Sequence, residues 1–190
     1  MADGALRVLG ISGSLRRGSF NSAALRAAQE LAPEGMTVEI ADISEIPPYN
    51  DDVRQERGYP PAVERLRAQI AAADALLIVT PEYNYSVSGV LKNAIDWASR
   101  PPNQPFDGKP VAIMGASGGL LGTARAQYHL RQILVFLNAF PINRPEVFIG
   151  QAAQKFDENG RFTDQTGRDL IRQLLVALAD WTRRLKGSGT

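Results

Sequence analysis

The chain has 190 residues, 44% of them hydrophobic and 22% charged, which predicts a single domain over residues 1–190. Its 21 basic and 20 acidic residues give a net charge of +1, which does not favour nucleic acid, an anionic membrane or a strongly charged partner. The absence of cysteine excludes disulfides and thiol redox chemistry, so a redox reaction here needs a bound cofactor.

Strands and helices are predicted to alternate along the chain. The first unit is a strand over Leu6–Ile11, a helix over Asn21–Leu31 and a strand over Thr37–Ala41. Residues 42–59 exceed the usual connection of about 4 to 6 residues, so we expect a long loop that lies over a site. No signal-peptide pattern or membrane-spanning run is found, which favours a cytoplasmic protein, with a disordered tail over about residues 187–190.

The rest of the chain continues the alternation. After a helix from Pro61 to Ala73, the unbroken apolar run Ala75–Val79 is typical of a strand buried on both faces. The remaining predicted elements are a helix over Ser88–Arg100, a strand over Val111–Gly115, a helix over Thr123–Leu137, a short strand over Glu146–Ile149 and a helix over Gln165–Leu185. Five strands and five helices predict an α/β fold: a doubly wound, flavodoxin-like parallel sheet in the order 2-1-3-4-5, with helices on both faces.

The turn over residues 12–21 (SGSLRRGSFN) follows the first strand and opens the first helix. Such a turn directs unpaired backbone N–H groups and the positive end of the helix dipole at one spot. The polar side chains expected around this spot are those of Ser14, Arg16, Ser19, Asn21 and Ser22. This density of donors favours an anion site over an ordinary turn capped by Ser19.

The residues that the turn lacks indicate which anion it binds. Gly13 and Gly18 have the spacing of a Walker A loop, but Ser19 stands where that pattern has lysine, which argues against a nucleoside triphosphate. The glycines do not fit the dinucleotide pattern either, and Asp42 lies later than the acidic residue that follows that pattern by about 20 residues. A single terminal phosphate fits best.

Two further loops follow strands that are neighbours in the predicted sheet. Residues 81–86 (PEYNYS) offer aromatic and polar groups, and residues 117–122 (SGGLLG) offer a glycine-rich floor that a flat ring can approach closely. Ligands of doubly wound sheets bind at the carboxyl ends of the strands, where the winding reverses. A phosphate-binding turn at residues 12–21, aromatic groups at residues 81–86 and glycines at residues 117–122 together suit flavin mononucleotide (FMN).

Three motifs follow one another along the chain. They are Gly13-Ser14-Leu15-Arg16-x-Gly18-Ser19-x-Asn21, Pro81-Glu82-Tyr83-Asn84 and Gly89-Val90-Leu91-Lys92-Asn93-Ala94-Ile95-Asp96-Trp97. In this order and spacing the chain resembles, over almost its whole length, the NADPH-dependent FMN reductases, a flavodoxin-like group that includes bacterial quinone and chromate reductases. One departure is Ser88, where related sequences commonly carry proline.

The resemblance implies an FMN-dependent NAD(P)H oxidoreductase that reduces quinones or other small acceptors, such as chromate, azo compounds or free flavin. It implies ping-pong hydride transfer at the flavin N5, so no catalytic residue and no metal ligand is assigned. The residues it places at FMN are Ser14, Arg16, Ser19, Asn21 and Ser22 at the phosphate, Pro81, Glu82, Tyr83 and Asn84 at the ring, and Ser117, Gly118 and Gly119 at the ring or ribityl chain. The physiological acceptor and the preference for NADPH or NADH stay open.

Some other residues are given structural interpretations. We expect a surface or interface role for His129, the only histidine, and a solvated ion pair between Lys92 and Asp96. At Glu82 the backbone is expected to matter more than the charge. The resemblance also implies a homodimer or homotetramer, whose candidate contacts are Arg125, Tyr128 and Glu146.

Two other functions remain as alternatives: a flavodoxin-type electron carrier and a non-catalytic module that binds a phosphate ligand. Carriers usually dock through a surface of one charge sign, which the near-neutral chain does not suggest. A bound flavin would exclude the phosphate-binding module, and reduction by NAD(P)H would separate an enzyme from a carrier.

Overall fold

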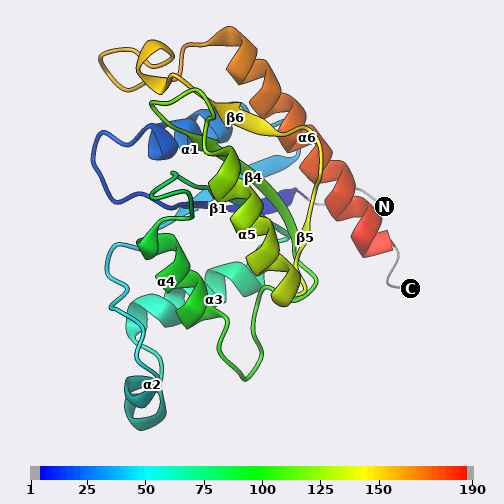
Figure 1. Ribbon diagram of the computed structural model, residues 1–190. Coiled ribbons are helices and arrows are strands. Elements are labelled where there is room, and N and C mark those ends of the chain that lie inside the picture. Colours follow the sequence, from blue (N-terminus) through cyan, green and yellow to red (C-terminus); the bar gives the residue numbers. More distant parts are fainter. Residues whose placement is uncertain (1–4, 188–190) are drawn as a thin grey trace.

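The computed structural model describes residues 5–187 and shows a parallel sheet between two layers of helices (Figure 1). The strands are β1 (Leu6–Ser12), β2 (Met36–Ala41), β3 (Ala75–Val79), β4 (Pro110–Ala116), β5 (Phe140–Pro141) and β6 (Val147–Ile149). The helices are α1 (Phe20–Glu30), α2 (Asp51–Arg57), α3 (Pro61–Ala72), α4 (Gly89–Ala98), α5 (Ala124–Phe136) and α6 (Gln165–Gly187), with a 3₁₀ turn over Ala152–Gln154. The sheet order β2-β1-β3-β4-β5 confirms the predicted topology.

Apolar side chains form a core on each face of the sheet. Helices α1 and α6 cover one face, and α3, α4 and α5 cover the other. Every residue of β3 is buried, because this strand lies in the middle of the sheet and alternates its side chains between the two cores. The unbroken apolar pattern of Ala75–Val79 predicted this position correctly.

The edge of the sheet beside β4 differs from the prediction, which placed one strand there, over Glu146–Ile149. Two short strands occupy it instead: β5 pairs with the start of β4, and β6 pairs with its end. A strand of two residues that contains Pro141 gives no periodic signal, and proline is tolerated there because the strand lies at an edge.

Helix α2 also corrects the prediction of a long loop over residues 42–59. Its N-terminus is capped by Asn50, whose Oδ1 accepts a hydrogen bond from the N–H of Asp52 at 2.9 Å, and it ends at Gly58 with a φ of 78°. None of its seven residues is buried, so it has no apolar stripe that a periodicity analysis could detect.

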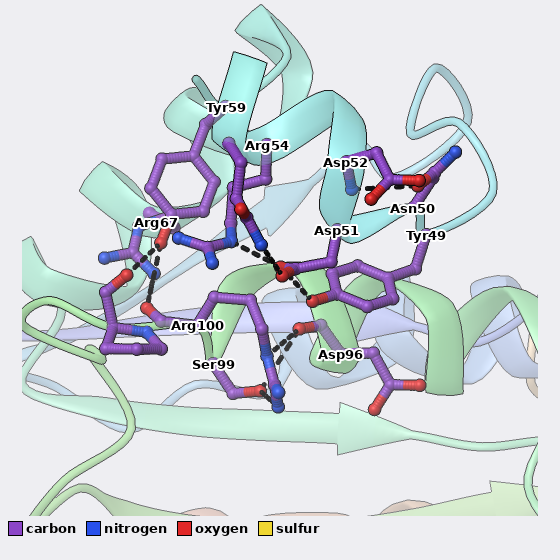
Figure 2. A network of polar contacts seen from close by, with 12 residues as sticks. Tyr49, Asn50, Asp51, Asp52, Arg54, Tyr59, Arg67, Asp96, Ser99 and Arg100 are labelled. Atoms are coloured by element: carbon purple, nitrogen blue, oxygen red, sulfur yellow. Dashed lines mark hydrogen bonds and ion pairs between the residues drawn. The ribbon is translucent and has the colours of Figure 1, made fainter. Parts of the chain in front are cut away.

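A polar network surrounds the start of α2 and the segments on either side of the helix (Figure 2). Tyr49 Oη and Arg54 Nε both donate to Asp51 Oδ1, at 2.8 and 2.7 Å. These hydrogen bonds, with that of Arg54 the strongest, hold the pKa of Asp51 well below its usual range. Tyr59 Oη donates to the carbonyl oxygen of Arg100 at 2.9 Å. The N–H of Tyr49 donates to Asn93 Oδ1 and Trp97 Nε1 donates to the carbonyl oxygen of Pro47, both at 2.8 Å, so the segments on both sides of α2 are tied to α4 and to the residues just after it.

Helix α6 runs two residues further than predicted, to Gly187. It begins after Asp164, whose Oδ2 accepts from the N–H of Gly167 at 2.8 Å. Residues 188–190 of the expected disordered tail lie outside the described residues. Between residues 5 and 187 there is no helix both long and apolar enough to span a membrane.

Candidate active site

Three loops meet at the carboxyl edge of the sheet because β1, β3 and β4 are adjacent parallel strands (Figure 1). They are residues 13–19 after β1, residues 80–88 after β3 and residues 117–123 after β4. Within the ladder, Ser12 pairs with Val79, which in turn pairs with Met114. The structure thus brings together the three segments that the sequence analysis singled out.

The first loop presents free hydrogen-bond donors. In the part of the chain that the structure describes, the backbone N–H groups of residues 15–18 and the hydroxyl of Ser14 make no hydrogen bond. The guanidinium of Arg16 has no ion pair or hydrogen bond there either, and its Cζ lies 5.6 Å from the centre of the Phe20 ring. Free donors of this kind at the N-terminus of α1 are what a phosphate group requires.

Three of the predicted phosphate ligands point inward instead. Ser19 is the N-cap of α1, and its Oγ accepts from the N–H of Ser22 at 3.2 Å. The side chain of Asn21, 4% exposed, donates to the carbonyl oxygen of Ala116 at 2.9 Å and accepts from its N–H at 2.8 Å. The Oγ of Ser22 lies 2.9 Å from that of Ser12. These hydrogen bonds hold the loop in shape and tie it to β4.

The second loop contains a tight turn with an unusual backbone. Tyr83 and Ser86 exchange two backbone hydrogen bonds of 3.0 Å, while Asn84 and Tyr85 have φ angles of 50° and 68°. Two consecutive positive φ angles are typical of a type I′ turn and are costly for residues other than glycine. The turn leaves the rings of Tyr83 and Tyr85 51% and 66% exposed, above the buried Pro81.

The third loop is held by backbone hydrogen bonds to residues 149–151, but in the described part of the chain two of its glycines have unpaired N–H groups and open space beside them. The N–H of Ser117 donates to the carbonyl oxygen of Ile149 at 3.0 Å, and the carbonyl oxygen of Gly119 accepts from the N–H of Gln151 at 2.9 Å. Within residues 5–187 the N–H groups of Gly118 and Gly119 make no hydrogen bond. A Cβ on either glycine would meet no atom within 4 Å, so the space beside both residues is open.

Large apolar side chains are exposed on all three loops. They are Leu15 (50%), Tyr83 (51%), Tyr85 (66%), Leu120 (79%) and Leu121 (52%). Exposed apolar groups gathered beside unpaired N–H donors are typical of a ligand-binding edge. A ligand with an anionic group at one end and a flat ring at the other matches this arrangement.

A cavity of about 360 Å³ adjoins the first loop. Ser14, Arg16 and Arg17 line one side, and Asp42 and Ser44, after β2, line the other. The N–H of Ser44 donates to Asp42 Oδ1 at 2.8 Å, and this bond is the main cause of a lowered pKa at Asp42. Only the start of the long 42–59 segment therefore borders the site.

Ser88 joins the first and second loops. Its Oγ donates to the carbonyl oxygen of Gly13 at 2.6 Å and accepts from the N–H of Leu91 at 3.3 Å, which caps α4. A Cβ on Gly13 would lie 3.0 Å from Cδ of Pro81, so the two loops are in close contact. Serine therefore makes a connection here that proline could not make.

We expect Ser88→Ala to lower the free energy of unfolding by about 1 to 2 kcal/mol, because α4 loses its cap and the Gly13 carbonyl loses a buried partner. Urea denaturation measures this change. Ser99→Ala, at the other end of α4, is the matched control, since its Oγ bonds residues of its own segment, the carbonyl oxygen of Asp96 at 3.3 Å and Nη2 of Arg100 at 3.0 Å. Equal losses for the two variants would contradict the proposed link.

Other residues lie partly as expected. Lys92 Nζ and Asp96 Oδ1 form the predicted pair, 2.7 Å apart. His129 is exposed, and its Nδ1 lies 3.0 Å from Ser86 Oγ, so it contacts the second loop. The described residues contain no cluster of three or more potential metal ligands.

The expectation for Glu82 was wrong, because its charge is used. The carboxylate is 8% exposed and forms an ion pair with Arg125. A glutamate soon after a buried strand and directly after a proline was a visible signal, but its partner lies 43 residues away, in the first turn of α5. Sequence reasoning named Arg125 only as a subunit contact and so missed this pair.

Known proteins resemble this chain over nearly its whole length. The family model of the NADPH-dependent FMN reductases matches residues 6–154. An NAD(P)H-dependent FMN reductase of Pseudomonas aeruginosa is 66% identical over 182 residues (96% of this chain, 98% of the relative), and a quinone reductase of Escherichia coli is 50% identical over 183 residues (95% and 97%). Among solved structures, FerB, a flavoenzyme NAD(P)H:(acceptor) oxidoreductase of Paracoccus denitrificans, has a TM-score of 0.84 at 36% identity and covers 94% of this chain and 98% of its own. The chain belongs to the NADPH-dependent FMN reductase family.

Proposed function

We propose that the chain binds FMN across the three loops and passes electrons from NAD(P)H to quinones or other small acceptors. Membership of the family makes the protein an oxidoreductase that uses FMN, with NAD(P)H as electron donor. One observation carries the assignment of the site: the free donors around Ser14 and Arg16 lie at the same sheet edge as exposed aromatic rings and open glycines.

The residues present fit FMN group by group. The N–H groups of residues 15–18, the hydroxyl of Ser14 and the guanidinium of Arg16 form a donor set suited to its phosphate. The exposed turn around Tyr83 and the bare backbone of Gly118 and Gly119 leave a place for its ring. Ser19, Asn21 and Ser22 would act indirectly, since they keep the phosphate loop in position.

FMN, when bound, supplies hydride acceptance and the release of two electrons. The chain's own residues then have two tasks. Ser14 and Arg16 anchor the phosphate, which fixes the position of the ring relative to the two other loops. The free N–H groups of Gly118 and Gly119 would offer hydrogen bonds to negative charge on the reduced ring. Neither task needs an acid or base, and we assign none.

Anaerobic reduction of the purified protein tests the proposal. We expect FMN absorption to bleach with NADPH or NADH and to return when a quinone is added. A protein without flavin would support the phosphate-binding module instead. Bleaching that requires a separate reductase protein would support an electron carrier. Comparing NADPH with NADH, and quinone with chromate, an azo dye and free FMN, ranks the donors and acceptors.

Gly119→Val is expected to weaken FMN binding while it leaves the apoprotein intact. A Cβ at this position would meet no atom within 4 Å, so we expect the unfolding temperature of the apoprotein not to change. The same side chain occupies the space assigned to the ring. Fluorescence titration should show a dissociation constant for FMN raised about tenfold or more, with a smaller change for Gly119→Ala. Unchanged affinity in both variants would show that the ring lies elsewhere.

We also propose that the protein is a homodimer or homotetramer. Tyr128 and Glu146 are candidate contacts, because both are exposed and the Oη of Tyr128 donates to Glu146 Oε1 at 3.0 Å, which holds the two side chains together on the surface. Light scattering at assay concentration tests the mass, and a monomer would contradict the proposal. We further propose a single FMN-binding domain over residues 1–190, which limited proteolysis tests, and a cytoplasmic location, which cell fractionation tests.

A further inference from the structure

The carboxylate of Glu82 connects the second and third loops. It is almost buried, at 8% exposure, and Oε2 accepts from the backbone N–H groups of Arg125 and Ala126 at 3.1 and 3.2 Å. Oε1 accepts from Arg125 Nε and also pairs with the terminal guanidinium nitrogen Nη2. One carboxylate from the loop after β3 thus caps α5, the helix that follows the loop after β4.

Helix α5 needs this remote cap because its own N-cap residue provides none. Thr123 has a φ of 72° and makes no side-chain cap, and its Oγ1 accepts from Gln127 Nε2 at 3.1 Å instead. The threonine packs so closely on β4 that a Cβ on Gly115 would lie 2.0 Å from Thr123 Oγ1. The N–H of Ala124 donates to the carbonyl oxygen of Leu121 at 3.0 Å, and the next two N–H groups of α5, those of Arg125 and Ala126, are satisfied by Glu82.

Arg125 extends the connection to the exposed aromatic turn. Its Cζ lies 3.7 Å from the centre of the Tyr85 ring, close enough for a cation–π contact. Tyr85 is one of the two turn residues with a positive φ. The guanidinium thus holds the turn from the side of α5, between the buried carboxylate and the exposed ring.

The two charges balance each other at the edge where the ring is assigned. Loss of Glu82 would leave the cation of Arg125, and loss of Arg125 would leave the carboxylate of Glu82 with its two backbone N–H donors at the start of α5. Two-electron reduction adds negative charge to a flavin. A net cation on these loops would favour the reduced form, and a net anion would favour the oxidised form.

We propose that Glu82 and Arg125 are positioning residues that fix the aromatic turn to α5 and, by their charge balance, set the reduction potential of the bound flavin. The proposal rests on the proposed function, because it requires FMN at this edge. It assigns to the pair a role distinct from subunit contact and from direct contact with substrate.

The experiment measures the midpoint potential of bound FMN by anaerobic dye equilibration in Glu82→Gln, Arg125→Gln and the double variant. We expect Glu82→Gln to raise the midpoint potential and Arg125→Gln to lower it. In each case the affinity for reduced FMN divided by the affinity for oxidised FMN should change by about tenfold. That ratio corresponds to about 30 mV for a two-electron couple. The double variant should return close to the wild-type value. Glu45→Gln, which breaks an exposed ion pair with Arg65, is the matched control and should change the ratio less than threefold.

If Glu82 and Arg125 only stabilise the fold, the midpoint potentials change differently. Both single variants would then bind FMN more weakly and shift the potential in the same direction or not at all, which would overturn the inference. Thermal unfolding of each apoprotein identifies a variant that fails to fold, and the double variant, which has no unpaired charge, then carries the comparison with wild type. A wild-type protein that binds no FMN overturns the proposed function and this inference together, whereas normal FMN binding with shifts of one sign overturns only the inference.

Discussion

The double variant Ser14→Ala with Arg16→Ala is expected to raise the dissociation constant of FMN by at least about 100-fold. Both side chains are free in the folded chain, so their removal breaks no internal contact of the described residues except the stacking of Arg16 near Phe20. Hydrogen bonds to a charged group are worth about 1.5 to 3 kcal/mol each, or about tenfold or more in affinity. Fluorescence titration of the apoprotein with FMN measures the change.

Two further variants define what this result means. Arg57→Ala removes an exposed arginine from α2 and should leave FMN affinity unchanged, which controls for net charge. Ser19→Ala should instead lower the free energy of unfolding by about 1 kcal/mol, because Ser19 caps α1. If the double variant binds FMN as tightly as wild type, the first loop does not hold the phosphate.

Trp97→Ala is expected to lower the free energy of unfolding by about 3 to 5 kcal/mol, the largest stability change predicted for this chain. The side chain is fully buried, its Nε1 donates to the carbonyl oxygen of Pro47 at 2.8 Å, and its ring packs edge-on against Tyr49 at 4.9 Å. Loss of the ring therefore removes both core packing and the anchor of the 42–60 segment. Urea denaturation of the apoprotein measures the loss.

Trp97→Phe separates these two contributions. Phenylalanine keeps most of the packing and loses one hydrogen bond, and the Pro47 carbonyl retains its bond from Asn93 Nδ2 at 2.9 Å. We expect a loss of about 1 kcal/mol for this variant. Equal losses for Trp97→Phe and Trp97→Ala would show that the hydrogen bond, and not the buried ring, holds the segment.

Short-range patterns were sufficient for much of the fold. The strand that continues into a serine-rich turn and a helix at residues 6–31, and the apolar run Ala75–Val79, each carry their own signal. Elements without such a signal were missed or misplaced. Helix α2 buries no residue, and β5 consists of two residues with a proline, so neither shows a hydrophobic period.

The candidate site was likewise predictable only in part. The sequence by itself determined where the three loops lie and that the first one carries free donors, because unpaired N–H groups are a local property of a strand, a turn and a helix start. Only the tertiary structure decided which side chains face outward. Asn21 turns inward to Ala116, 95 residues away, and Glu82 pairs with Arg125, 43 residues away. Side-chain direction depends on partners that the folded sheet brings close, and no local pattern encodes those partners.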